Sequence, residues 1–191
     1  MTELREGRWT AEADEGNVVF LIGMRVNRWR KPWRWVPVAA AMPRMLAELA
    51  RNPALGLLGA RTFVGGRTTL VLQYWKSFDH LAGYARNPQQ AHLPAWRAFN
   101  RRARGNRDVG VFHESYVMTP RGMESVYVNM PEFGLGKATR SVPVAERGQS
   151  AAHRLDPQVP DDPAVAAAAD AVAAGRPSGR EVERHPGRRT R

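Results

Sequence analysis

The chain has 191 residues, of which 43% are hydrophobic and 25% charged, as in an ordinary folded domain. Because it contains no cysteine, disulfides, thiolate nucleophiles and cysteine-ligated metal centres are excluded, and a reducing compartment is indicated. The longest apolar stretch, Val18 to Met24, is far shorter than the roughly 20 residues that cross a bilayer. We therefore expect a cytoplasmic protein with no membrane span and no signal peptide.

The charge balance is basic, with 29 Lys and Arg against 18 Asp and Glu and a formal net charge of +11. Most of the excess lies in residues 1–140, and nearly all of the basic residues are arginines. A compositional bias toward arginine explains this pattern, and recognition of an anion or a nucleic acid is the alternative.

The two ends of the chain differ from its middle. Residues 1–15 are polar, and we expect a flexible lead-in. Residues 141–191 contain no aromatic side chain, several Pro and Gly, and an alanine-rich run from Ala164 to Ala174. Such a segment buries little apolar surface, and short isolated helices are marginal. The sequence therefore predicts one folded domain over 16–140, followed by a disordered tail rich in Ala, Pro and Arg.

The domain begins with a strand and a helix. Residues 17–27 are apolar and β-branched on both faces, which is typical of a strand covered on two sides. A turn is expected over 28–35, and apolar residues then recur at helical spacing over 37–51. Pro43 predicts either a kink or a helix that starts near residue 42.

A hairpin and further elements follow. Two β-rich runs, 57–64 and 68–75, flank Gly65 and Gly66, which predicts a β-hairpin. The remaining elements are expected in this order: a helix over 77–87 capped by Ser77, a helix over 93–104, a strand over 109–119 and a short strand over 124–129.

This order of elements predicts an α+β fold, the ferredoxin-like split βαβ plan with an antiparallel sheet. Helices on one face of such a sheet leave the other face open, yet the predicted strands are apolar on both faces. A second copy of the same sheet is the expected cover, so we expect a homodimer.

Several short matches in one order carry a family resemblance. They are Pro43 to Leu46, Leu57-Leu58-Gly59, Tyr74-Trp75 before Ser77-Phe78, His92 with Trp96, and Phe112 to Tyr116. Over residues 18–129 the chain resembles the monooxygenase-like family formerly known only as a domain of unknown function, a branch of the dimeric α/β-barrel superfamily.

The resemblance implies a dimer whose sheets pack face to face, with a ligand pocket in each subunit between the sheet and its helices. The superfamily includes cofactor-free quinone-forming monooxygenases, haem-degrading enzymes, haem-dependent aldoxime dehydratases and chlorite-converting enzymes. Fold membership alone does not choose among these activities.

The residues and the family resemblance together leave three candidate functions. The leading one is a monooxygenase-like oxidoreductase that binds an apolar or aromatic small molecule, with either no cofactor or an unknown one. A haem-binding protein with dehydratase- or peroxidase-like chemistry is the first alternative. A non-enzymatic module that binds a ligand or contacts nucleic acid is the second, and nucleic acid is the least favoured partner.

His92 is the first candidate for chemistry, because it shares one helical stripe with Trp96 and Phe99. A histidine on an inward stripe is suited to moving a proton or to binding haem iron. A purely structural histidine is the alternative.

The strand over 109–119 supplies two further candidates. His113 alternates with Glu114 and Tyr116, so these two side chains lie on the opposite face from His113. We expect His92 to face one of these two sets, and the sequence does not say which. Glu114 and Tyr116 are preferred because they provide an acceptor and a donor. The predicted catalytic residues are therefore His92, Glu114 and Tyr116, and a buried polar pair that satisfies itself is the alternative.

Residues 28–35 interleave four cationic side chains with three tryptophans. A lid over the pocket or a dimer contact is the expected role, and a plain surface loop or contact with nucleic acid or membrane are the alternatives. No metal-ligand motif stands out. The predicted substrate-binding residues are all aromatic: Trp33, Trp35, Tyr74, Trp75, Trp96 and Phe99.

Overall fold

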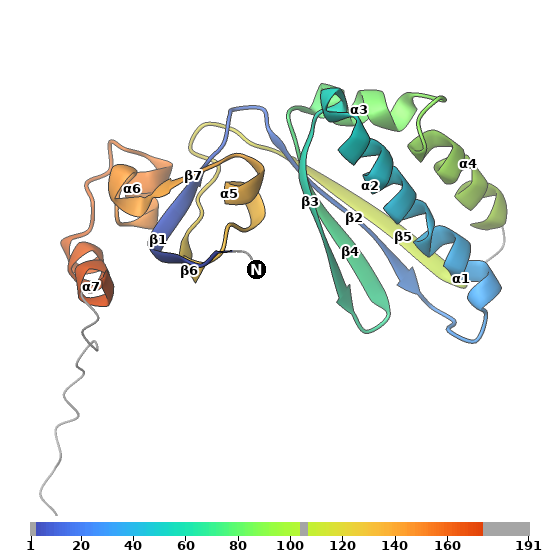
Figure 1. The fold of residues 1–191 in the computed structure, drawn as a ribbon, viewed down its shortest axis with the longest axis horizontal. Helices are drawn as coiled ribbons and strands as arrows, with labels where there is room; N and C mark the ends of the chain where they lie inside the picture. The colour runs from blue at the N-terminus through green and yellow to red at the C-terminus, as the bar shows by residue number, and fades with distance from the viewer. Residues whose placement is uncertain (1–2, 104–106, 174–191) are drawn as a thin grey trace, which may run out of the picture.

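The computed structural model describes residues 3–103 and 107–173 (Figure 1). Two antiparallel sheets organise this part of the chain: a four-stranded sheet with helices on one face, and a three-stranded sheet beside it. The larger sheet and its helices form the part that the sequence predicted.

The larger sheet consists of β2 (Val18–Val26), β3 (Leu57–Gly65), β4 (Thr68–Trp75) and β5 (Val109–Val117). The strand order is β3-β4-β2-β5, and each neighbouring pair is antiparallel. The central strands β2 and β4 are each followed by helices, while β3 and β5 form the edges. This order is that of a ferredoxin-like domain and confirms the predicted fold class.

Helices cover one face of this sheet (Figure 1). They are α1 (Pro32–Ala39), α2 (Ala41–Arg51), a 3-10 turn (Pro53–Leu55), α3 (Phe78–Arg86) and α4 (His92–Ala103). The buried core between the sheet and these helices consists of Val18, Phe20, Met45, Leu49, Trp75, Leu81 and Tyr84.

The first helix differs from the prediction. A turn was expected through residue 35, but α1 already begins at residue 32. The proline at this position lies in the first turn of the helix. Proline is favoured there because its fixed φ suits a helix and its missing N–H has no intrahelical partner to lose. Helix α1 ends before Ala40, and α2 begins directly after it. Pro43 lies in the first turn of α2, which confirms a helix start near residue 42.

The predicted hairpin and helix cap are confirmed. Strands β3 and β4 are joined at Gly66 and Arg67, and Gly66 has a φ of 56°, a left-handed conformation that glycine adopts at little cost. At the start of α3, the Ser77 hydroxyl accepts a hydrogen bond from the backbone N–H of His80 at 3.3 Å.

The smaller sheet joins segments from opposite ends of the chain. Strand β1 (Arg5–Glu12) lies between β6 (Tyr127–Met130) and β7 (Arg140–Pro143). The helical segments around it are α5 (Gly134–Ala138), a 3-10 turn (Val144–Glu146), α6 (Ala151–Leu155) and α7 (Pro163–Ala173). Helix α5 contacts β3 of the larger sheet, and a Cβ added at Gly59 would lie 3.1 Å from Ala138.

The structure thus differs from the predicted boundaries at both ends. Residues 5–12 form a strand instead of a flexible lead-in, and 140–143 pair with it instead of starting a disordered tail. The short strand expected over 124–129 occurs as β6 and pairs with β1. The partners of β1 lie far along the sequence, so local patterns do not reveal them. Residues 174–191 of the predicted tail lie outside the described residues.

Within the described ranges, no helix combines the length and apolar character required to cross a membrane.

Truncation tests the role of the C-terminal segment. Ending the chain after Thr139 removes β7 and exposes the site filled by Val142 and Val144, which are 4% and 1% exposed. We expect the free energy of unfolding to fall by about 3 kcal/mol or more, because each buried valine contributes about 1.5 kcal/mol or more. Urea denaturation measures this. A chain ended after Ala173 keeps every described strand and is the control, and equal stability of the two truncations would contradict the prediction.

Candidate active site

A large groove lies between the helix-covered face of the larger sheet and helices α1 to α4. Its volume is about 1190 Å³, and most of its lining side chains are apolar. Two arginines, Arg44 and Arg86, also line it, and both side chains are exposed to solvent. A groove of this size and lining suits an apolar small molecule.

Alternate residues of the central strands form the floor of the groove, because successive side chains of a strand point to opposite faces. Val71, Gln73 and Trp75 of β4 lie opposite Ile22, Phe20 and Val18 of β2, and all of these side chains face the helices. Trp75 is 1% exposed, and its indole Nε1 donates a hydrogen bond to Gln73 Oε1 at 2.9 Å. The floor therefore contains one polar side chain held in place by a tryptophan.

Strand β5 adds a histidine to the groove. His113 pairs with Ile22 and Ser115 with Phe20, so both side chains face the helices and line the groove. The rings of His113 and Phe20 lie 5.8 Å apart between centroids. His113 therefore faces the groove with a flat apolar neighbour beside it.

Glu114 and Tyr116 point to the other face of the sheet, away from α4. The expectation that they face His92 is wrong, because α4 packs on the side of the sheet to which His113 points. The Tyr116 hydroxyl donates to Glu114 Oε2 at 2.6 Å on a surface where Tyr116 is 55% exposed. This hydrogen bond, together with the carboxylate charge, raises the pKa of Tyr116.

His92 begins α4 and lines the groove. Its Nδ1 lies 3.1 Å from the carbonyl oxygen of Ala85, and a carbonyl only accepts. Nδ1 is therefore the nitrogen that carries the proton in the neutral ring, and Nε2 keeps a free lone pair. The ring also packs 6.0 Å from that of Tyr84, which limits its rotation. His92 thus has the geometry of a positioned base on the groove wall.

The rest of the predicted stripe on α4 also faces the groove. Trp96 and Phe99 line it, and their rings stack with centroids 5.7 Å apart and an interplanar angle of 21°. Trp96 is 42% exposed. A flat substrate can therefore reach a stacked aromatic pair that is open to solvent on one side.

Three predicted binding residues lie elsewhere. Tyr74 faces the opposite side of the sheet, where it packs toward α5 and where burial, followed by the charge of Tyr127, raises its pKa. Trp33 and Trp35 are absent from the groove lining within the described residues. They fall on the first turns of α1, and the Trp35 indole folds back to donate to the carbonyl of Trp29 at 3.2 Å.

Residues 28–35, which contain the arginines and tryptophans described above, are attached to the start of β5 by ion pairs. Arg28 and Lys31 form ion pairs of 3.4 and 3.3 Å with the carboxylate of Asp108, which is 4% exposed. These contacts fix the loop between β2 and α1. Its predicted role as a lid or a dimer contact stays a prediction.

Glu48 of α2 holds the helices above the groove together. Its Oε2 accepts hydrogen bonds from the Tyr84 hydroxyl of α3 and from the backbone N–H of Ala91, both at 2.9 Å. Burial, followed by the hydrogen bond and charge of Glu48, raises the pKa of Tyr84. Because Ala91 directly precedes His92, this carboxylate also sets the position of the candidate base.

The sequence analysis did not name His113 or Gln73 as catalytic or substrate-binding residues, yet both have polar side chains that line the groove. The parity of residues 109–117 separates His113 from Glu114 but does not show which face meets the helices. Gln73 had a detectable signal, since it is an amide placed between Val71 and Trp75 on one face of the strand.

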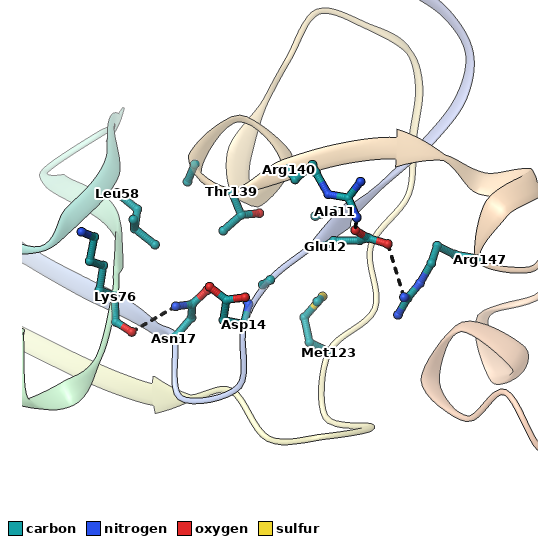
Figure 2. A pocket seen from close by; sticks show the side chains of 12 residues that line it. Ala11, Glu12, Asp14, Asn17, Leu58, Lys76, Met123, Thr139, Arg140 and Arg147 are labelled. Carbon is teal, nitrogen blue, oxygen red and sulfur yellow. Dashed lines mark hydrogen bonds and ion pairs between the residues drawn. The ribbon is translucent and has the colours of Figure 1, made fainter.

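A second cavity of about 650 Å³ lies at the junction of the two sheets (Figure 2). In it the carboxylate of Glu12 pairs with both Arg140 and Arg147. The Asn17 amide donates to the carbonyl of Lys76 at 3.0 Å and joins the loop before β2 to the end of β4. The Glu12 ion pairs hold β1 to the segment around β7 within the smaller sheet, and the Asn17 bond holds two segments of the larger sheet, so we assign these contacts a structural role.

The strand order of the larger sheet, with helices over one face and a ligand-sized groove under them, defines an α+β protein of the ferredoxin-like class. Residues 17–135 match the family described as "Monooxygenase af470-like", and the chain belongs to that family. The predicted family resemblance is confirmed.

Known relatives agree with this placement. Monooxygenase af470 of Aspergillus fumigatus (strain Af293) is 33% identical over 150 residues, which cover 70% of this chain and 50% of that protein. The chain therefore spans about half the length of this relative.

Two solved structures are also similar. The aldoxime dehydratase OxdRE in complex with butyraldoxime is 16% identical, with a TM-score of 0.58 over 72% of this chain and 42% of that chain, and shares the fold. SnoaB, a cofactor-independent oxygenase from Streptomyces nogalater, is 15% identical, with a TM-score of 0.40 over 55% of this chain and 94% of that chain.

Removal of the Glu48 carboxylate should loosen the helices. We expect Glu48→Ala to lower the free energy of unfolding by about 2–3 kcal/mol, because two hydrogen bonds lose their acceptor. Tyr84→Phe, which removes one of them, should cost about 1 kcal/mol. Urea denaturation compares both with Glu146→Ala, an exposed control expected to change stability by less than about 0.5 kcal/mol. A Glu48→Ala protein as stable as this control would refute the anchoring role.

Proposed function

We propose that the protein is a monooxygenase-like oxidoreductase that oxidises an apolar or aromatic small molecule held in the groove. The observation that carries the proposal is the free Nε2 of His92 on the wall of an apolar groove. Membership of a monooxygenase-like family agrees with it.

The chemistry needs a base and a substrate that is rich in electrons. Nε2 of His92 takes the proton of a phenol or enol, and the resulting anion gives an electron to O₂. The superoxide and the substrate radical combine in a carbon–oxygen bond, and His92 returns its proton to the resulting peroxide, giving a hydroperoxide that loses water to leave a carbonyl. One oxygen atom stays in the product and the other leaves as water, so O₂ is the only oxidant required.

The groove supports this step through its largely apolar lining. Aromatic and aliphatic side chains make up most of that lining, and a low-polarity site strengthens the interaction between the anion and its hydrogen-bond partners. His113, beside Phe20, is a second imidazole available to the same substrate.

The test uses 1-naphthol, which reacts with one O₂ to give 1,4-naphthoquinone and one water. We expect oxygen uptake by the wild-type protein and a fall in kcat of about 100-fold in His92→Ala, with KM little changed, because a general base is lost. Arg97→Ala, an exposed change on the same helix, should retain full activity. Equal kcat in His92→Ala and Arg97→Ala would exclude His92 as the base.

The same geometry also suits a second candidate function, haem binding. His92 would hold the iron of a bound haem through Nε2, because its Nδ1 is already held by the carbonyl of Ala85. The absorption spectrum of the purified protein decides between the two. A Soret band that is lost in His92→Ala would support haem, whereas oxygen uptake without such a band supports the cofactor-free reaction.

A homodimer completes the proposal. The face of the larger sheet away from the helices carries apolar side chains that are exposed or half-exposed: Leu21, Phe63, Leu70, Leu72 and Tyr116. Covering such a face stabilises the protein, and a second copy of the same sheet supplies a matching surface. We expect about 800 Å² or more to be buried on each partner.

Light scattering tests the dimer. We expect a particle of twice the 21.3 kDa chain mass. Leu72→Glu should shift it to the monomer mass, because a charge at the centre of the interface is left without water or a partner. Gln89→Glu adds the same charge at an exposed position between α3 and α4 and should stay dimeric. A monomeric wild-type protein would contradict the proposal.

A further inference from the structure

The side-chain amide of Gln73 has a strong hydrogen bond at its oxygen and only a weak acceptor at its nitrogen. It is the buried amide on the groove floor, 4% exposed, and its Oε1 accepts from the Trp75 indole at 2.9 Å. An indole N–H can only donate, so the orientation of the amide is fixed. Its Nε2, which carries two hydrogens, contacts the thioether sulfur of Met42 at 3.8 Å.

A thioether is a poor acceptor for such a donor. Burial of an amide N–H without a strong acceptor costs free energy, and an oxygen atom that enters the groove would regain it. Met42 also lines the groove on α2, and its flexible side chain can give way to such an atom. The floor thus contains a fixed donor that is ready for an incoming acceptor.

We infer that Nε2 of Gln73 binds an oxygen of the substrate, a carbonyl or a phenolate or enolate oxygen, and so selects oxygenated aromatic molecules over hydrocarbons. The inference rests on the proposed function and names the class of substrate for the same groove. For this contact Trp75 is a positioning residue, because its indole N–H fixes the orientation of the Gln73 amide.

The position of the donor suits the proposed reaction. Gln73 lies on the floor in β4, whereas His92 lies on the wall in α4, so the two groups approach a bound molecule from different elements. A donor aimed at an oxygen that becomes negative during the reaction stabilises that charge more than it stabilises the neutral substrate. Gln73 therefore contributes to both selection and rate.

Two probes of nearly equal shape isolate the donor: α-tetralone, which has one carbonyl oxygen, and tetralin, which has none. Equilibrium dialysis gives the Kd of each. We expect Gln73→Met to weaken α-tetralone binding about five- to tenfold, as for one hydrogen bond, and to leave tetralin binding unchanged. Gln89→Met makes the same chemical change at an exposed position and should affect neither probe.

A second variant covers the case in which Gln73→Met does not fold. Met42→Leu conserves volume and removes the sulfur that contacts the amide. We expect it to tighten α-tetralone binding or leave it unchanged, with tetralin again unaffected.

The outcomes separate the inference from the proposed function. Equal losses for both probes, no loss of α-tetralone binding in Gln73→Met, or weaker α-tetralone binding in Met42→Leu would overturn the role of Gln73. Selective loss of α-tetralone binding together with absent oxygen uptake would retain that role and overturn the oxygenase proposal. If the wild-type protein binds neither probe, the groove is not a ligand site and both fail.

Discussion

The carboxylate of Glu48 accepts one hydrogen bond from the phenol of Tyr84 and one from the backbone N–H of Ala91, so one side chain of α2 fixes both α3 and the start of α4. His92 follows immediately and is oriented by the carbonyl of Ala85 at the end of α3. Helices α2 and α3 pack directly on the sheet through Met45, Leu49, Leu81 and Tyr84, and the Glu48 carboxylate adds a polar connection between these helices and the start of α4.

The alternation of side chains along the strands divides the larger sheet into two surfaces with different roles. The face toward the helices carries His113 and the Gln73 amide, which is locked by Trp75. The other face carries leucines and the hydrogen-bonded pair of Glu114 and Tyr116. A substitution in one strand therefore affects either the ligand groove or the proposed dimer face, according to its parity.

Sequence patterns predicted the strands and helices of the larger sheet, because burial on both faces, glycine turns and proline stops are local signals. They could not choose which face of residues 109–117 meets the helices, and the preference for Glu114 and Tyr116 over His113 was wrong for that reason. They also missed the smaller sheet, since the charged and polar residues of β1 hide its pattern and its partners are distant in sequence. His92 was found because an amphipathic helix shows its inward stripe directly.

The smaller sheet also has a consequence for how the chain folds. Strand β1 precedes the larger sheet in the chain, yet Arg5 pairs with Met130 and Thr10 with Val142, so β1 has neither partner strand until residues 127–143 have been made. The larger sheet needs only residues up to β5 and can form earlier on the ribosome. Strand β1 must then remain available while the strands of the ligand-binding part are made, and the smaller sheet closes only after the larger one is complete in sequence.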